Sequence, residues 1–423
     1  MKKIVALSLL MMLIFSAVVL AQDSEEITLT MLWSGTAYEN DFETEILPRL
    51  VKEKFPNITL ESTKLPDDQY YTVLKTKLAS GEAADIILVQ PGMAGANGVL
   101  TLAESGLLEP ITNLKALDNF GPQARDVYTY EGEVYGISGG LGILGTYYNK
   151  DMFAKYDLKV PSNWQEFLNA CKVLQDNGEI PIVMGDKDNY VMQFGLYQIG
   201  ANGHYKDNPD YDQELVNGES KFTDDGTWDD ILAKYKTLYD NNYITESSFG
   251  LSAQQAIQLF VDGNAAMIFD GSFNASAIRA EGSANFERGY FPLPANPEGE
   301  DTYASVSISG GPAITASSEH KEAAKKVLEL WFDGQSEIFK EYIDTGRFIY
   351  SYGYAADKSD PLFKPFIDLY QEGKSFYWFN QQWPSGVNDQ MQESFTEAVY
   401  GRKTIDEVTE DMQLKLEELL MYQ

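Results

Sequence analysis

The first hundred residues alternate between strand-like and helix-like patterns of apolar positions. Residues 27–33 alternate apolar and polar side chains, which predicts a first strand. A helical face of apolar residues follows at 42–51, where Pro48 should kink or split the helix. Further strands are expected at 58–64 and 85–89, with a helix between them. This β-α-β-α-β order predicts a lobe built on a parallel sheet covered by helices.

After residue 160 the apolar positions mostly follow the period of amphipathic helices. A Ser or Thr followed three residues later by Gln or Glu predicts where three of these helices begin. The pairs are Ser162 with Gln165, Ser252 with Gln255, and Thr404 with Glu407. A buried strand is expected at 265–269, and residues 304–308 resemble a strand that crosses between two bodies. A second α/β lobe is therefore expected.

Residues 134–153 lie between the two patterns and are rich in glycine. Gly139, Gly140, Gly142 and Gly145 fall within an extended run, where glycine marks a bend or a close approach of backbone. Three of them match G-x-G-x-x-G, but the residues that follow favour a strand, whereas a dinucleotide site requires a helix there. We favour a hinge or strand crossing between two bodies, with an ordinary glycine-rich turn as the alternative.

The N-terminus has the pattern of a secretory signal peptide, predicted to span residues 1–21. Lys2 and Lys3 precede an apolar run at 4–20, and small residues allow cleavage after Ala21. The run is short for a membrane-spanning helix. Because no cysteine stands at the cleavage point, a lipid-anchored form is disfavoured. The protein is therefore expected to be free in the periplasm.

Composition indicates how many domains to expect, which partners are disfavoured and how the single cysteine behaves. A chain of 423 residues with 44% apolar content can bury more than one core, so two domains are expected. Its formal charge of −32 repels nucleic acid and anionic lipids, so neither is expected as a partner. Cys171 is the only cysteine and falls on an apolar helical face, which predicts a buried thiol without a disulfide.

The sequence offers little for catalysis. His204 and His320 are the only histidines, and no phosphate-binding G-x-x-x-x-G-K motif occurs. Acidic pairs such as Asp229–Asp230 could be glycosidase carboxylates, but they lie where helices are predicted to begin, and the helix dipole explains them there. The acidic run at 207–214 could hold calcium, although a solvated loop is favoured because the glycine of an EF-hand is absent. No enzyme activity and no cofactor are expected.

The glycine-rich segment also carries a family resemblance. Tyr135-Gly-Ile137 followed by Tyr147-Tyr-Asn-Lys-Asp-Met-Phe153 resembles the first lobe crossing of the extracellular solute-binding proteins of carbohydrate ABC importers, family 1, which includes maltose-binding protein. Further matching stretches, in the order of the family, are 78–81, 85–87, 105–111, 161–167, 265–272, 310–318 and 401–404. Together they cover nearly the whole chain after the signal peptide.

The resemblance implies a fold and a division of the chain. The fold is the two-lobed α/β periplasmic binding protein fold of type II, with the ligand between the lobes. The N-terminal lobe would comprise 22–138 and 309–357, and the C-terminal lobe 146–304 and 361–423. The hinge crossings would be 139–145, 305–308 and 358–360. This interleaving follows from the resemblance alone.

Candidate ligand residues come from strand ends, from aromatic loops and from the resemblance. Ligands of open parallel sheets sit at the carboxyl ends of strands, and sugars stack on rings and bond to Asp, Asn and Gln. The nominated residues are Trp33, Gln69, Gln90, Gly92, Ser138, Gly140, Asp188, Tyr190, Gln193, Asp270, Ser272, Phe273, Ser309, Gly310, Trp378, Trp383 and Asn388. For Trp378 and Trp383, core packing is the open alternative.

The resemblance also implies the function and the partners. The protein would capture a sugar or oligosaccharide by hinge closure and deliver it to an ABC permease, with the ATPase on a separate chain; a monomer is expected. An acidic residue common in maltose-binding relatives is missing beside Gln90, and Phe273 and Asn388 replace stacking tryptophans, which disfavours a maltose-like ligand. A peptide or another polar metabolite is the alternative ligand, and a secreted glycoside hydrolase is a remote one.

Overall fold

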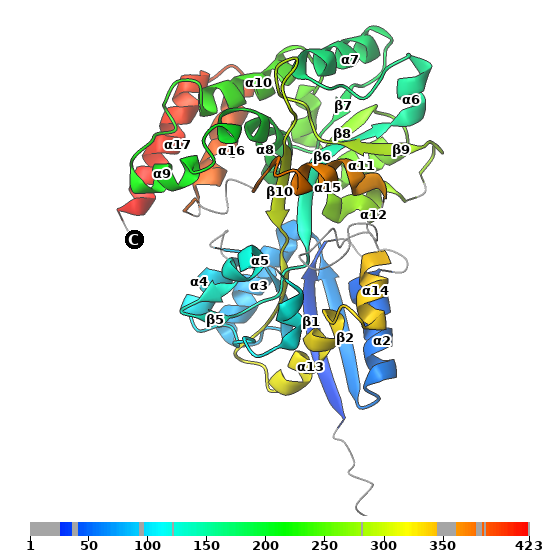
Figure 1. The fold of residues 1–423 in the computed structure, drawn as a ribbon, viewed down its shortest axis with the longest axis vertical. Coiled ribbons are helices and arrows are strands. Elements are labelled where there is room, and N and C mark those ends of the chain that lie inside the picture. The colour runs from blue at the N-terminus through cyan, green and yellow to red at the C-terminus, as the bar shows by residue number, and fades with distance from the viewer. Residues whose placement is uncertain are drawn as a thin grey trace, which may run out of the picture.

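The protein consists of two α/β bodies stacked one above the other, as seen in a computed structural model (Figure 1). The structure describes residues 26–35, 41–92, 97–120, 122–280, 282–344, 361–377, 383–384 and 386–421. The signal peptide, Trp378 and the crossing expected at 358–360 lie outside these ranges. Within them, no helix is long and apolar enough to cross a membrane.

The N-terminal lobe contains a four-stranded sheet in the order β11-β3-β1-β2. Its strands are β1 (Ile27–Ser34), β2 (Ile58–Leu65), β3 (Ile86–Val89) and β11 (Gly311–Ile314). β1, β2 and β3 are parallel as predicted, but β11 returns from far along the chain and runs antiparallel to β3. The parallel pairing expected for the first three strands is therefore confirmed, and β11 adds an antiparallel strand at one edge.

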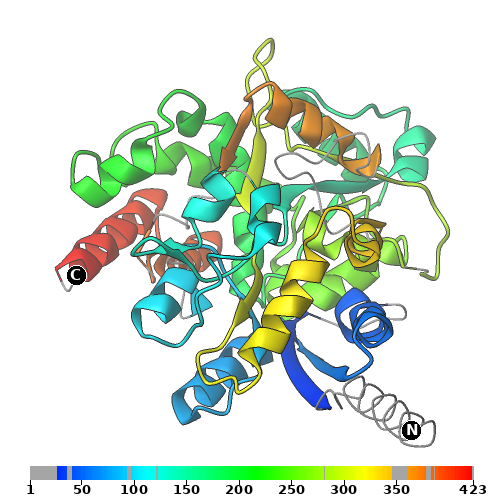
Figure 2. The same ribbon diagram turned by 60° about the horizontal axis from the view of Figure 1, so that its bottom comes forward.

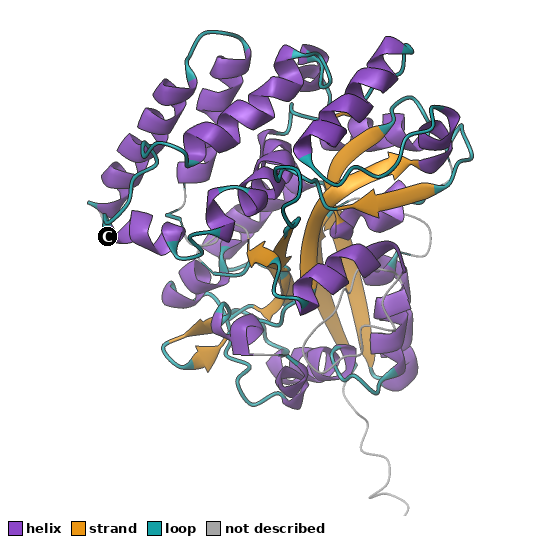
Figure 3. Cartoon of the chain, turned by 45° about the horizontal axis from the view of Figure 1, so that its top comes forward, coloured by secondary structure: helices purple, strands orange, loops and turns teal. Residues whose placement is uncertain are grey.

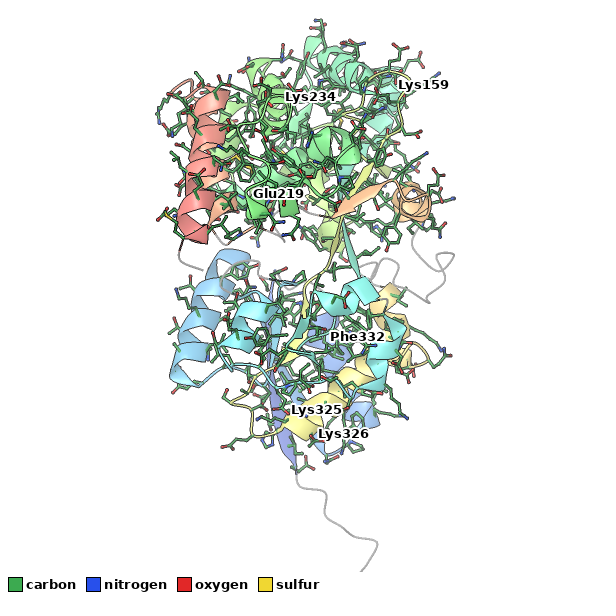
Figure 4. All side chains as sticks on the ribbon, turned by 60° about the vertical axis from the view of Figure 1, so that its left-hand side comes forward. Lys159, Glu219, Lys234, Lys325, Lys326 and Phe332 are labelled. Atoms are coloured by element: carbon green, nitrogen blue, oxygen red, sulfur yellow. The ribbon has the colours of Figure 1, made fainter. Side chains whose placement is uncertain are left out.

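Helices cover both faces of this sheet (Figure 1). They are η1 (Phe42–Ile46), α2 (Leu47–Lys54), α3 (Asp67–Ser80), α4 (Val99–Glu104), η3 (Lys115–Asn119), α5 (Pro122–Asp126), α13 (Lys321–Trp331) and α14 (Glu337–Asp344), with the hairpin β4 (Thr129–Tyr130) and β5 (Glu133–Val134) beside them. Pro48 stands in the first turn of α2, directly after η1, so the predicted split of this helix is confirmed. After α13 ends, Phe332 is buried in the core, while Lys325 on α13 donates to Glu109 at the surface (Figure 4).

The C-terminal lobe contains a larger mixed sheet in the order β12-β10-β6-β8-β7, with β9 also paired to β6. Its strands are β6 (Leu141–Asn149), β7 (Ile182–Val183), β8 (Met267–Gly271), β9 (Arg288–Phe291), β10 (Ala304–Ile308) and β12 (Ser375–Tyr377). β6 is antiparallel to β8, β9 and β10. Figure 3 shows these strands between layers of helices.

The helices of this lobe are spread over residues 150–420. They are α6 (Lys150–Lys155), α7 (Trp164–Asp176), η4 (Asn189–Met192), α8 (Gln193–Asn202), η5 (His204–Lys206), α9 (Tyr211–Asn217), α10 (Trp228–Asp240), η6 (Glu246–Gly250), α11 (Ala253–Val261), η7 (Ser272–Asn274), α12 (Ala275–Ile278), η9 (Pro361–Phe363), α15 (Lys364–Gln371), α16 (Val387–Val399) and α17 (Ile405–Leu420). The chain ends beyond α17 at the periphery of the molecule (Figure 2).

The predicted capping boxes had different outcomes. Those that open α11 at Ser252 and α17 at Thr404 are confirmed, with both reciprocal hydrogen bonds present. The box expected at Ser162 and Gln165 is wrong. Asn163 caps α7 by accepting from the backbone N–H of Glu166 at 3.0 Å, because the helix begins one residue later than the box requires.

A two-stranded ribbon joins the two bodies. Ile137 N donates to Pro312 O at 3.0 Å, Gly139 N to Gly310 O at 3.2 Å, and Ser309 N to Gly140 O at 2.9 Å. The pairing continues without a break into β6 and β10, where Leu141 stands opposite Ile308. Because β6 follows the glycines directly, G-x-G-x-x-G opens no helix, and the chain passes here from one sheet to the other.

Glycine is required in this ribbon because the two strands approach closely. A Cβ atom on Gly311 would lie 1.8 Å from Ile137 O, and one on Gly139 would lie 2.6 Å from Gly310 O. Gly140 has φ of +114°, a backbone conformation that favours glycine. The ribbon therefore combines close pairing with a sharp bend where it passes between the lobes.

Candidate functional site

The edges of both sheets meet at this ribbon. In the N-terminal lobe, β3 ends at Val89 opposite Gly311, which places the following Gln90 beside the ribbon. A Cβ atom on Gly310 would lie 3.1 Å from the side-chain oxygen of Gln90, so the amide of Gln90 covers this glycine. Ser309 and Gly310 precede an antiparallel strand and therefore share an edge with the carboxyl end of β3.

The C-terminal lobe reaches the same ribbon from the other side. β8 ends at Gly271, which stands opposite Leu144 near the start of β6. Ser272 is buried, and its Oγ accepts from Ile143 N at 3.0 Å. The turn at 270–273 is thus held on the strand that crosses between the lobes. The carboxyl ends of β3 and β8 accordingly both lie beside the strands of the ribbon.

Two nominated residues of the ribbon stabilise its bend. Ser138 is buried, and its Oγ donates to Gly140 O at 2.8 Å while accepting from Gly140 N at 3.0 Å. Tyr128 donates to Ser309 O at 2.7 Å from the N-terminal lobe. These contacts fix backbone geometry, and in this conformation Ser138 directs its polar atom at its own chain.

The other nominated residues of the N-terminal lobe differ in exposure. Trp33 is only 6% exposed and packs against Trp331, with ring centroids 5.6 Å apart. Gly92 is buried and donates to Val127 O at 2.8 Å. Gln69 is exposed in the first turn of α3. Of these three residues, Gln69 has a side chain that solvent and ligand can reach.

An exposed aromatic ring stands at the end of β8. Phe273 is 39% exposed, and its ring covers Gly271, where a Cβ atom would lie 2.1 Å from it. The buried ring of Phe194 meets it edge to face at a centroid distance of 5.8 Å, and half-buried Tyr190 meets Phe194 at the same distance. Phe273 is therefore an accessible ring on a rigid support.

The polar residues nearby are held in place by short contacts. Asp188 Oδ2 accepts from Ala253 N at the start of α11, at 2.8 Å. Asp270 is buried, and its Oδ1 accepts from Gly271 N at 2.6 Å and from Asn274 Nδ2 at 2.9 Å. Gln193 is 9% exposed at the first position of α8. The orientation of Asp188 and Asp270 is thus determined by the fold.

The aromatic loop near the C-terminus has a different role from the one favoured by the sequence. Trp383 is 2% exposed, packs on Phe222 and Trp228, and donates from Nε1 to Asp212 at 3.0 Å. The structure places it in the core, the alternative left open by the sequence. Asn388 on α16 is half-buried and accepts from Tyr197 at 2.6 Å.

Asp212 is a buried acid that the sequence did not single out. It accepts hydrogen bonds from Tyr205 at 2.6 Å and from Trp383 at 3.0 Å. Burial raises its pKa to about 7, and these two hydrogen bonds oppose the rise. The residue lies in the acidic run considered for calcium, but it stands in the first turn of α9 and is buried.

The described residues offer little support for a metal site or for acid–base catalysis. Within the described ranges, no group of three or more His, Cys, Asp or Glu side chains could hold a metal ion. Asp229 accepts hydrogen bonds from the backbone N–H groups of Thr227 and Gly226 at 2.7 and 3.2 Å. It therefore stabilises the start of α10, as the sequence predicts for the acidic pairs. Cys171 is buried as predicted, and burial raises its pKa well above the ordinary value.

Comparison with known proteins gives the family. Residues 40–333 match the bacterial extracellular solute-binding proteins. The chain belongs to this family. As a member of the family, it is an extracellular binding protein of the two-lobed type II fold, and the two bodies joined by a crossing ribbon are its lobes.

Individual relatives match over nearly the whole length. The "Multiple sugar-binding protein" of Streptococcus mutans is 24% identical over 371 residues, which are 86% of this chain and 85% of that protein. A structure from work on xylan utilisation by Caldanaerobius polysaccharolyticus has a TM-score of 0.78 at 22% identity and covers 92% of this chain and 100% of that one. A "Chitin oligosaccharide binding protein" has a TM-score of 0.77 at 24% identity and covers 94% and 99%.

Proposed function

We propose that this protein captures a sugar or an oligosaccharide between its two lobes and delivers it to the permease of an ABC transporter. The observation that carries the proposal is Phe273, an accessible ring on a rigid aromatic support, beside a turn of fixed polar groups at the end of β8. The apolar face of a pyranose stacks on such a ring, while its hydroxyls need oriented donors and acceptors.

The chemistry of the relatives supports a carbohydrate. The S. mutans relative is named for multiple sugars, and the two structural neighbours are described with xylan and with chitin oligosaccharides. All three descriptions refer to saccharides. Their range supports the class of ligand but selects no single sugar.

Within the nominated set, exposure and position favour some residues as direct ligand contacts. On the N-terminal side these are Gln69, Gln90, Ser309 and Gly310; on the C-terminal side they are Asp188, Tyr190, Gln193, Phe273 and Asn388. We propose that Trp33 and Trp383 support this site from the two cores, because each ring is at most 6% exposed.

The glycine-rich ribbon is the proposed hinge. Backbone pairs bind it together along its length, and glycines at its centre permit changes of φ and ψ that other residues resist. A ligand that contacts both walls shifts the balance toward the closed form, because only that form offers both sets of contacts.

Export completes the proposal. The first 21 residues would be removed as a signal peptide, leaving a monomeric periplasmic protein without a lipid anchor. The ATPase would be a separate chain, because this sequence has no phosphate-binding loop motif. The protein would carry its ligand without changing it.

A thermal-shift screen of the mature protein tests the proposal. The panel would contain mono- and oligosaccharides, amino acids and short peptides, and a binding ligand raises the melting temperature by mass action. We expect stabilisation by at least one saccharide and a smaller shift in a Phe273→Ala variant. Stabilisation by a peptide or amino acid, with no response to any saccharide, would overturn the ligand class. Turnover of chromogenic glycosides would indicate a hydrolase instead.

A further inference from the structure

Helix α8 connects residues proposed for ligand binding to a strand that leads toward the other lobe. All ten of its residues are buried, and it packs against β6 and β10. Its first residue is Gln193, and the ring of Phe194 meets Phe273 edge to face. The N-terminal end of α8 therefore belongs to the proposed ligand site.

Two side-chain amides of α8 reach the segment 293–303, which joins β9 to β10. Gln198 and Asn202 are each 1% exposed, and their spacing of four residues places them on one face of the helix. Gln198 Oε1 accepts from Leu293 N at 2.9 Å. Asn202 Oδ1 accepts from Tyr303 N at 2.7 Å, and its Nδ2 donates to Tyr303 O at 3.0 Å. Asn202 thus bonds both backbone polar groups of one residue, as a partner in an antiparallel sheet does.

Tyr303 is the last residue before the strand that enters the ribbon. β10 begins at Ala304, pairs with the first half of β6 and is followed by Ser309 of the ribbon. At the other end of the segment, Leu293 lies just beyond β9, which pairs with the second half of β6. The two amides of α8 therefore hold this segment at both ends, once beside β9 and once beside β10.

A third buried amide in the same segment makes similar contacts without reaching α8. Asn296 is 0% exposed, and its Nδ2 donates to Ser162 O at 3.1 Å and to Glu300 O at 2.8 Å. Its Oδ1 accepts from the hydroxyl of Thr302 at 3.1 Å. Buried backbone groups outside helices and strands need such partners, which is sufficient reason for Asn296. Asn202 differs because it also connects the ligand helix to β10.

We propose that Gln198 and Asn202 are positioning residues, which fix β10 in place relative to the ligand contacts at the start of α8. This inference rests on the proposed function. Closure aligns the contacts of both lobes on a ligand only if the C-terminal lobe turns as one body with the strand that carries it. If Tyr303 shifts against α8, Gln193 and Phe273 meet the ligand in a different orientation, and hydrogen bonds weaken steeply with misalignment.

Matched alanine variants separate positioning from stability. Asn202→Ala and Asn296→Ala each remove one buried amide, so both should lower the melting temperature. We expect only Asn202→Ala to weaken binding of xylan or chitin oligosaccharides, by about tenfold in calorimetry at a temperature where every variant is folded. Gln198→Ala loses one bond to the segment and should weaken binding by a smaller factor, which keeps the test available if Asn202→Ala does not fold. Equal losses of affinity in Asn202→Ala and Asn296→Ala would overturn the proposal.

Hydrogen exchange of the mature protein without sugar tests the placement of β10 separately. In Asn202→Ala we expect faster exchange of the Tyr303 amide and of the β10 amides, because the strand loses its connection to α8. Asn296→Ala should leave the β10 amides at the rates of the parent. Unchanged β10 exchange in Asn202→Ala would overturn the positioning role. Faster β10 exchange in a protein that binds no saccharide would instead support the connection to α8 and overturn the proposed function.

Discussion

Phe273 is the side chain on which the proposed recognition depends most at the scale of single residues. Its ring is accessible although it is apolar and large, and Phe194 holds it in one orientation. An exposed ring elsewhere on the same lobe, Tyr400, has the same exposure of 39% and provides a matched comparison.

We predict that Phe273→Ala weakens sugar binding about tenfold, which corresponds to roughly 1.4 kcal/mol. The reason is loss of the surface on which the sugar stacks. Isothermal titration calorimetry with the sugar identified by screening measures the effect, and Tyr400→Ala should leave the affinity unchanged. Equal affinity for Phe273→Ala and the parent would remove this ring from the site.

Asp212 leads to a prediction about pH. Its pKa rises from an ordinary value of 3.8 to about 7 in the folded protein, mainly through burial. The folded state therefore binds this proton more tightly than the unfolded state. Its contribution to stability is fully present below about pH 4 and is lost as the pH rises through about 7.

We predict that Asp212→Asn reduces the fall in melting temperature between pH 5 and pH 8. The amide can still accept from Tyr205 and Trp383 but carries no charge at any pH. Melting curves of parent and variant across this range measure the difference. Asp186, whose pKa rises to about 6, keeps part of the pH dependence in both proteins. Identical slopes would mean that Asp212 does not titrate in this range.

Residue roles were the hardest feature to predict from the sequence. The density of rings around Trp383 indicated a site, but whether that ring faces ligand or core depends on Asp212, a partner 171 residues earlier in the chain. The spacing of apolar residues along the sequence predicts contacts only between residues that are close in the chain. By contrast, Trp228 and Trp331 lie on regular apolar faces of α10 and α13, and both are buried.

At the scale of elements, the ribbon between the lobes allows a sharp test. Gly311 has no room for a side chain, because a Cβ atom would lie 1.8 Å from Ile137 O and 2.8 Å from Gly139 N. We predict that Gly311→Ala costs about 1–3 kcal/mol of stability, since the paired strands must separate. Chemical denaturation measures this cost.

Gly250 provides the control for that change. A Cβ atom there would meet nothing within 4 Å, so Gly250→Ala should stay within about 0.5 kcal/mol of the parent. If both variants unfold at the same denaturant concentration as the parent, the close pairing of the ribbon is not a feature of the protein in solution.

The start of α7 tests the corrected cap. Asn163 accepts from Glu166 N, whereas Ser162 contacts the Glu166 side chain at an exposed position. We predict that Asn163→Ala costs about 1 kcal/mol and that Ser162→Ala costs less. Melting temperatures of the two variants compare them, and the reverse order would restore the cap predicted from the sequence.

Element types were predictable where local chemistry determines them. The capping boxes at Ser252 and Thr404 and the split at Pro48 needed only neighbouring residues and are confirmed. The antiparallel strand β11 could not be predicted in this way. It pairs with β3 more than two hundred residues earlier, and nothing in its own four residues specifies that partner.

At the scale of the whole molecule, two sheets and a crossing ribbon define the fold. Length and composition indicated two domains, but the return of β11 and α13 to the first sheet came from family resemblance alone. The detailed lobe boundaries remain a proposal. Two separate sheets joined by a narrow glycine-rich ribbon nevertheless support the proposal that one lobe moves against the other.

Small-angle X-ray scattering of the mature protein, with and without the sugar identified by screening, tests the central claim most directly. We predict that the radius of gyration falls when the sugar saturates the protein and that Phe273→Ala requires a higher sugar concentration for the same change. A radius of gyration that stays constant while calorimetry shows saturation would contradict capture by closure of the two lobes.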